Sequence, residues 1–170
     1  MRFADIPAFP RGDYEVNVDW TYVESKLARE DPKIDLEPDF QRAHVWTREQ
    51  QIAYVEYRLH GGESGSLLYF NCPGWMGDFR GPYQIVDGKQ RLEAVRAFMR
   101  SELPVFGHYY NEFTDHIRSR YATFHWRVAA LESRANILRW YLAINKGGTP
   151  HASEELARVE ELLRQEQRKK

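Results

Sequence analysis

The sequence has little cysteine, no long apolar run and no surplus of either charge. Its one cysteine, Cys72, cannot form an internal disulfide and stands in no metal-binding spacing, so we expect it to be structural. No apolar run approaches the roughly 20 residues that span a bilayer. The first residues also lack the order of a signal peptide. We therefore expect a cytoplasmic protein without membrane contact.

The charges nearly cancel. The chain has 24 Lys and Arg against 25 Asp and Glu, for a formal net charge of -1. Such a balance provides no general field that would hold a long nucleic acid by counterion release. If the protein contacts DNA, we expect the contact to be local.

Core-forming residues are abundant. The sequence is 42% hydrophobic and 14% aromatic, which excludes a disordered chain. A chain of 170 residues fits one domain, so we expect a single domain over residues 1–170.

Hydrophobic spacing and turn residues predict alternating strands and helices. We expect an irregular lead-in over 1–16. Helices are predicted at about 20–30, 48–60, 89–99, 132–144 and 152–168, and strands at 66–70, 83–86, 103–105 and 124–131. The second helix has the strongest signal, because Thr47 and Gln50 form a capping box and Gly61 follows its apolar stripe.

A predicted strand passes through a glycine turn directly into a helix. The turn reads Asp87-Gly88-Lys89-Gln90-Arg91. A helix start favours an anion, and glycine lets the backbone approach it closely. Lysine and arginine add donors for phosphate oxygens, and the aspartate could bind Mg²⁺ or accept a proton. The alternative is a solvated turn in which Asp87 caps the helix.

A second polar cluster precedes the capping box. It reads Pro38-Asp39-Phe40-Gln41-Arg42, and His44 and Trp46 follow it. By itself, this pattern fits a loop anchored by burial of Phe40 and Trp46 equally well. Among the histidines, only His44 is a functional candidate, because it lies beside Arg42.

Together, these segments resemble a known family. The patterns PDFQRAHVW at 38–46, YQIVDGKQRL at 83–92 and NKGGTP at 145–150 follow one another as in ParB/sulfiredoxin-like proteins with a DGQQR-type motif. The N-terminal domain of GmrSD-type restriction proteins is an example. The resemblance implies an α+β fold with a small mixed sheet flanked by helices. Lys89 departs from the pattern, where glutamine is usual.

The resemblance also implies a nucleotide site. The expected phosphate-binding residues are Gln41, Arg42, Gly88, Lys89, Gln90 and Arg91, the expected catalytic residues are Asp87 and Asp39, and Asp87 is the expected metal ligand. The implied cofactors are an NTP and Mg²⁺. The leading hypothesis is phosphoryl transfer from the NTP to water or an acceptor hydroxyl, in a DNA-modification or phage-defence context. A DNA-nicking nuclease and a non-catalytic nucleotide sensor with a protein partner remain alternatives.

The stretch 106–113 is rich in aromatic residues. Its rings are Phe106, His108, Tyr109, Tyr110 and Phe113. Such rings could stack on a nucleobase, although aromatic clusters more often belong to a core. The sequence leaves both roles open.

A double-mutant cycle tests whether the two motifs form one site. If Arg42 and Arg91 contact the same phosphate, Arg42→Ala and Arg91→Ala should couple by roughly 0.5–3 kcal/mol in nucleotide affinity. Calorimetry measures the affinities after circular dichroism has shown that each variant is folded. Additivity within about 0.3–0.5 kcal/mol would mean that the arginines act independently.

Overall fold

The computed structural model describes residues 14–30, 33–41, 45–75, 77–78, 80–117, 121–146 and 153–168. A five-stranded mixed sheet lies at its centre, in the order β1-β5-β3-β4-β2. The strands are β1 (Tyr14–Asp19), β2 (Ile34–Asp35), β3 (Leu67–Asn71), β4 (Tyr83–Asp87) and β5 (Thr123–Ala129). The pairs β1–β5 and β3–β4 are antiparallel, and β5–β3 and β4–β2 are parallel.

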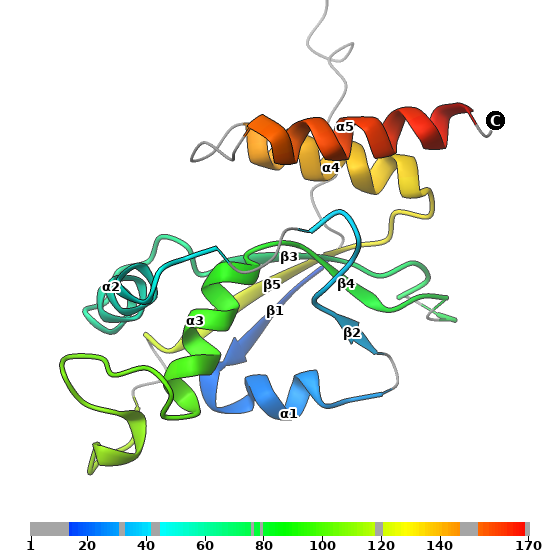
Figure 1. Cartoon of the computed structure of the whole chain (residues 1–170). Helices are drawn as coiled ribbons and strands as arrows, with labels where there is room; N and C mark the ends of the chain where they lie inside the picture. Colours follow the sequence, from blue (N-terminus) through cyan, green and yellow to red (C-terminus); the bar gives the residue numbers. More distant parts are fainter. Residues whose placement is uncertain are drawn as a thin grey trace, which may run out of the picture.

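Helices cover both faces of the sheet (Figure 1). On one face lie α1 (Val23–Leu27), α2 (Arg48–Leu59) and α3 (Lys89–Met99); on the other, α4 (Arg134–Lys146) and α5 (Ser153–Arg168) lie side by side. Short 3-10 helices occur at Trp20–Tyr22 and Tyr110–Glu112. The fold is therefore α+β, as expected.

Side-chain alternation along the strands separates two cores. On β3, Leu68 and Phe70 pack against α2 and α3, whereas Tyr69 packs toward α4. On β4, Ile85 belongs to the core with α2 and α3, and Val86 belongs to the core with α4. Because neighbouring strand residues point to opposite faces, one short strand contributes to both cores.

The β3–β4 pair contains a β-bulge near the end of β4. Tyr69 faces Asp87 and Phe70 faces Ile85, so Val86 is the extra residue. A bulge bends its strand and re-aims the side chains that follow it. Here the residue that follows is Asp87.

Buried Asn71 fixes the start of the segment that leads to α4. Its Nδ2 donates to the carbonyl of Leu131 at 3.1 Å, and its Oδ1 accepts from the Leu131 N–H at 2.8 Å. This reciprocal pair joins the end of β3 to the chain just after β5. It therefore helps to hold α4 over the sheet.

Most predicted elements are confirmed, with local corrections. The predicted lead-in is wrong from Tyr14, where β1 begins, and β2 was not foreseen. The predicted strand at 103–105 is also wrong: Val105 makes only an isolated bridge with His108. Cys72 is buried in the core. In the part of the chain that the structure describes, no helix combines the length and apolar character needed to cross a membrane.

The start of α2 provides a stability test. Thr47 Oγ1 accepts from the Gln50 N–H at 3.3 Å, and Gln50 Oε1 accepts from the Thr47 N–H at 2.9 Å. Replacing an N-cap threonine with alanine should lower the free energy of unfolding by about 0.5–2 kcal/mol. Urea titration of Thr47→Ala measures the loss, and Thr47→Ser should retain most of the stability. Equal losses in both variants would contradict the capping role.

Candidate functional site

The turn between β4 and α3 requires glycine. Gly88 has φ +99° and forms the N-cap of α3. A Cβ at this position would overlap Leu68 Cδ2 and lie 3.3 Å from Arg91 Nη2. Both the backbone conformation and the close contact with β3 therefore exclude a side chain here.

Arg91 reaches back from the first turn of α3 to both strands. Its Nη2 forms an ion pair with Asp87 Oδ2, and its Nη1 donates to the Leu67 carbonyl at 2.8 Å. The two side chains keep 19% and 27% exposure, respectively, so the pair lies at the rim rather than in the core. The sequence suggested that Arg91 faces a phosphate; in the structure its donors serve the protein itself.

Gln41 binds the bulge on β4. Its Nε2 donates to the carbonyls of Ile85 at 3.1 Å and Val86 at 2.8 Å. Successive carbonyls of a regular strand point to opposite edges, and the bulge brings these two toward one amide. β2 pairs with β4 only at Tyr83 and Gln84. Beyond the end of β2, the side chain of Gln41 takes over the hydrogen bonding to this edge of β4.

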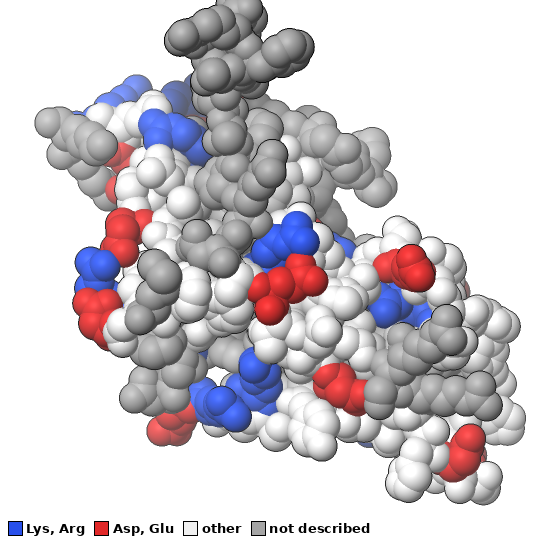
Figure 2. All heavy atoms as spheres, turned by 180° about the vertical axis from the view of Figure 1, so that it is seen from behind, with Lys and Arg blue, Asp and Glu red and all other residues white. Residues whose placement is uncertain are grey.

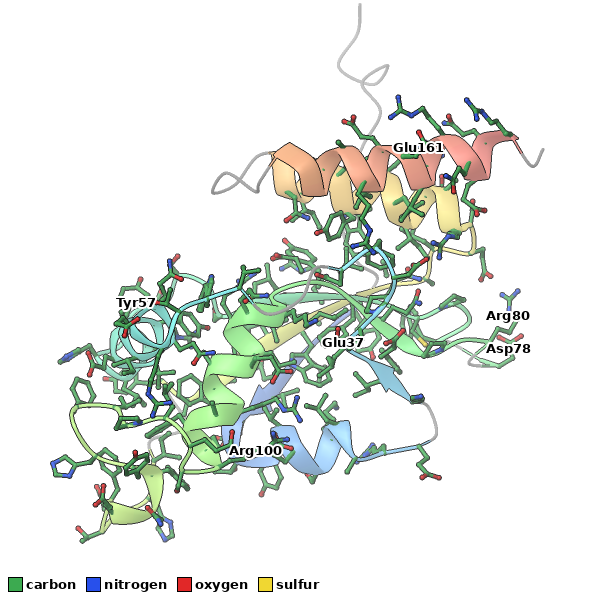
Figure 3. The ribbon with its side chains drawn as sticks, in the orientation of Figure 1. Glu37, Tyr57, Asp78, Arg80, Arg100 and Glu161 are labelled. Atoms are coloured by element: carbon green, nitrogen blue, oxygen red, sulfur yellow. The ribbon has the colours of Figure 1, made fainter. Side chains whose placement is uncertain are left out.

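Two further side chains bind the same loop from the α3 side. Buried Gln90 accepts the N–H groups of Val45 and Trp46 through its Oε1, at 2.9 and 3.1 Å. Buried Lys89 pairs with Glu37, whose Oε2 lies 2.7 Å from Nζ. Figure 3 shows where Glu37 lies in the fold. The two sequence motifs therefore meet in space, as expected.

Arg42 and His44 lie outside the described residues. Their neighbours on both sides are bound to the β4–α3 turn, through Gln41 before them and Val45 after them. The roles predicted for Arg42 and His44 stay predictions.

Asp39 lies toward the C-terminal helices. Its Oδ2 is 2.5 Å from Arg134 Nη2 on α4, and its carbonyl accepts from Arg158 on α5. Arg134 Nε also lies 3.6 Å from Glu166 Oε1. These partners gave no signal in the sequence, because they are separated from Asp39 by most of the chain. The side chain of Asp39 is 58% exposed and available to solvent.

Tyr54 and Arg91 both pack near Gly65. Tyr54 on α2 donates to the Gly65 carbonyl at 2.8 Å, and Arg91 Cδ packs near Gly65. Burial raises the pKa of Tyr54 to about 12, although the charges of Arg58 and Arg91 act to lower it. Tyr54 is therefore a neutral hydrogen-bond donor at physiological pH.

Comparison with protein families decides which family this arrangement represents. A family model described as "GmrSD restriction endonuclease, N-terminal domain" matches residues 25–160, which include both motifs and most of the chain. The chain belongs to the GmrSD N-terminal domain family. Neither curated proteins nor solved structures gave a match.

The GmrSD-type domain offers one partly exposed carboxylate at its turn, Asp87. Mg²⁺ is commonly held by one or two carboxylates together with water and substrate phosphates, so the donor set fits this ion. No group of three or more His, Cys, Asp or Glu side chains able to hold a metal occurs among the described residues. Figure 2 shows acidic and basic side chains interspersed on the face that it displays.

Paired substitutions test how the loop is held. Gln41→Met and Gln90→Met retain side-chain bulk but remove the bonds to the β4 carbonyls and to the Val45 and Trp46 N–H groups. Gln41→Met should lower the free energy of unfolding by about 1–3 kcal/mol, because the carbonyls of buried Ile85 and Val86 lose their partner, and Gln90→Met by less, because Val45 is exposed. Since both hold one loop, their effects should couple by about 0.5–3 kcal/mol in chemical denaturation. Strict additivity would show that the two attachments are independent.

Proposed function

We propose that this GmrSD-type domain binds a nucleoside triphosphate at the β4–α3 turn and transfers its terminal phosphoryl group to water or an acceptor hydroxyl. The observation that carries the proposal is the left-handed Gly88 turn at a helix start, closed over by a loop that Gln41 and Gln90 hold in place. Phosphoryl transfer depends mainly on positioning and charge neutralisation, which such a turn can supply.

Arg91 supplies the charge in this proposal. Its guanidinium is held by the bond from Nη1 to the Leu67 carbonyl, which phosphate binding at Nη2 would leave in place. A phosphate at the turn would compete with Asp87 for Nη2. The released Asp87 carboxylate would then be free to hold Mg²⁺, which neutralises phosphate charge when bound. Nucleotide binding and exposure of the metal ligand are thereby linked.

Asp39 is the proposed proton acceptor, and Lys89 has a supporting role. Asp39 is exposed and paired with Arg134. The ammonium of Lys89 is buried against Glu37. We infer that Lys89 acts on the phosphate through the position of the loop, in addition to its charge.

The family description supports a second candidate, Mg²⁺-dependent nicking of DNA. The family is that of a restriction endonuclease domain, which makes DNA a partner to test. The near-neutral charge of the chain favours local DNA contacts rather than a long basic track.

One set of incubations separates these functions. The protein is mixed with each NTP, with and without Mg²⁺ and plasmid DNA, and nucleotides and DNA topoisomers are then resolved. Nucleotide turnover without nicking supports phosphoryl transfer to water, and Mg²⁺-dependent nicked circles support the nuclease. Nucleotide binding without either product would indicate a sensing module.

Asp87→Asn tests the proposed metal ligand. The variant keeps the shape of the turn but weakens both the ion pair with Arg91 and the affinity for a hard cation. Turnover should fall by about tenfold or more, while NTP affinity changes less, because Arg91 remains available to phosphate. Initial rates over a Mg²⁺ titration and calorimetric binding provide the two readouts. Asp78→Asn, at an exposed aspartate that pairs with Arg80, is the control. An unchanged rate would assign Asp87 a purely structural role.

A further inference from the structure

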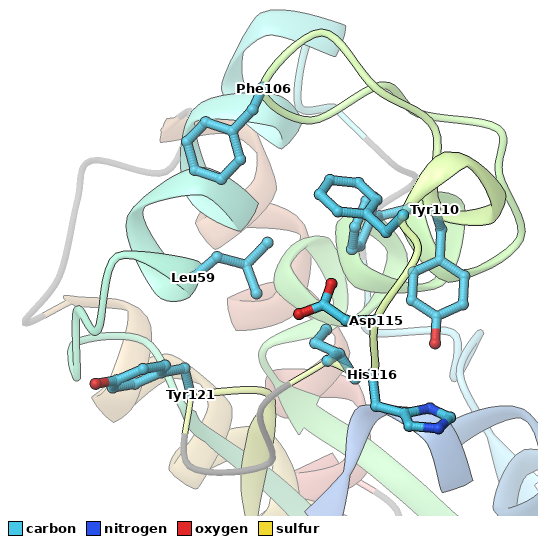
Figure 4. Close-up of a pocket in the computed structure, with 9 residues that line it drawn as sticks. Leu59, Phe106, Tyr110, Asp115, His116 and Tyr121 are labelled. Atoms are coloured by element: carbon cyan, nitrogen blue, oxygen red, sulfur yellow. The ribbon is translucent and has the colours of Figure 1, made fainter.

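A pocket of about 260 Å³ opens beside the C-terminal end of α2. Apolar and aromatic side chains form most of its wall, with two polar residues among them (Figure 4). The lining residues are Leu59, Phe98, Phe106, Tyr110, Phe113, Asp115, His116, Ile117 and Tyr121. Its volume is below the roughly 300 Å³ at which pockets for drug-sized ligands begin, so it suits a single planar ring system.

Phe106 is held in an unfavourable backbone conformation at this pocket. Its φ is +52°, a region that bulky residues rarely adopt. The Phe106 N–H donates to Glu56 Oε1 at 2.8 Å, and the His60 ring meets the phenyl ring edge-on at 5.0 Å. Despite these contacts, Phe106 remains 43% exposed. Phe106 and Gly107 both have positive φ between the bridged residues Val105 and His108, as a two-residue hairpin turn requires, and this turn presents the phenyl ring to the pocket.

Asp115 places a carboxylate among these rings. In Figure 4 its oxygens point into the space between Leu59 and Tyr110, whereas the ring of His116 points away. Asp115 is exposed to solvent, and no hydrogen bond or ion pair joins it to the residues that the structure describes. A ligand that fills the pocket would need to present donors to two adjacent acceptor oxygens.

Tyr121 also lines a second, polar pocket of about 640 Å³. Arg58 belongs to this pocket and is only 4% exposed. Its Nη2 donates to the carbonyls of Tyr121 and Thr123, both at 3.0 Å. Its Nε and Nη1 are buried without a hydrogen-bond partner among the described residues. These donors are sealed from the pocket, so the positive charge of Arg58, rather than a direct hydrogen bond from them, favours an anionic group in the pocket.

We propose that the aromatic pocket binds a guanine base, with the attached sugar-phosphate directed toward the Arg58 pocket. Guanine is the base whose N1–H and exocyclic amine lie side by side, so it alone offers two neighbouring donors to one carboxylate. Adenine and cytosine place a ring acceptor beside their amine, which would face the charge of Asp115. Stacking against Phe106 supplies affinity, and Asp115 selects the base.

This proposal rests on the proposed function, because that function makes a nucleotide or DNA the ligand. The base could come from a free guanine nucleotide or from a DNA strand. Phe98 lies near the end of α3 opposite to Asp87, about 15 Å away by helical rise. The pocket is therefore separate from the turn at Asp87, and its occupancy can be measured without turnover.

Binding of GMP, AMP, CMP and UMP by calorimetry tests the pocket. GMP should bind at least about tenfold more tightly than the other three, the scale of a charged hydrogen-bond pair. Phe106→Leu keeps an apolar side chain but removes the ring, and should weaken GMP binding by about fivefold or more. Tyr22→Leu, at an aromatic residue that is 68% exposed and outside the pocket, is the matched control.

Asp115→Asn tests selectivity separately from stacking. This variant should lose most of the preference for GMP over AMP, while Asp78→Asn should keep it. Equal affinities for the four nucleotides, or unaltered GMP binding in Phe106→Leu, would overturn the proposal. A thymidine oligonucleotide with one dG is then compared with the same strand without dG and with GMP. If the strand with dG binds more tightly than both, the guanine base comes from DNA. Guanine binding without NTP turnover would defeat the proposed function alone, and turnover without guanine preference would defeat the pocket alone.

Discussion

The site depends on a single amide that satisfies two carbonyls at a β-bulge. β2 is too short to pair with the end of β4, and the extra residue Val86 brings neighbouring carbonyls to the same edge. Unpaired, these groups would cost about 1–3 kcal/mol each if buried. Gln41 binds both, so the loop that carries the PDFQR motif has to lie against the turn that carries the DGKQR motif.

Local signals made much of the fold predictable. The capping box of Thr47 and Gln50, the glycine after α2 and the apolar runs in β3 and β4 all act within a few residues of the elements that they define. β1 and β2 were missed for a different reason. β1 does alternate, with Tyr14, Val16 and Val18 opposite to Glu15, Asn17 and Asp19, but the prolines and glycine before it indicated an irregular lead-in, and β2 is two residues long.

At the candidate site, too, the sequence identified local features but not the contacts between distant segments. Sequence motifs indicated which residues gather, but they assigned Lys89, Gln90 and Arg91 to phosphate because these residues carry suitable donors or acceptors. The structure gives each of them a protein partner: Glu37, the Val45 and Trp46 N–H groups, and Asp87. No sequence pattern identifies Glu37, since an exposed glutamate before a proline is common on any surface. Only the fold brings it beside a buried ammonium.

These internal partners constrain how a ligand could act. Arg91 is the residue that links β3, β4 and α3, and a phosphate that attracts its Nη2 would weaken the contact to Asp87 while leaving the bond from Nη1 to Leu67. The strands would stay joined, so the rearrangement would be confined to the turn. The loop would respond as well, because Gln90 lies one residue before Arg91 and holds Val45 and Trp46. At the other side of that loop, Asp39 is bound to α4 and α5. If a nucleotide binds at the turn as proposed, a rearrangement there would act on a loop that Gln41 joins to β4 and Asp39 joins to α4 and α5, which is a route toward the C-terminal helices.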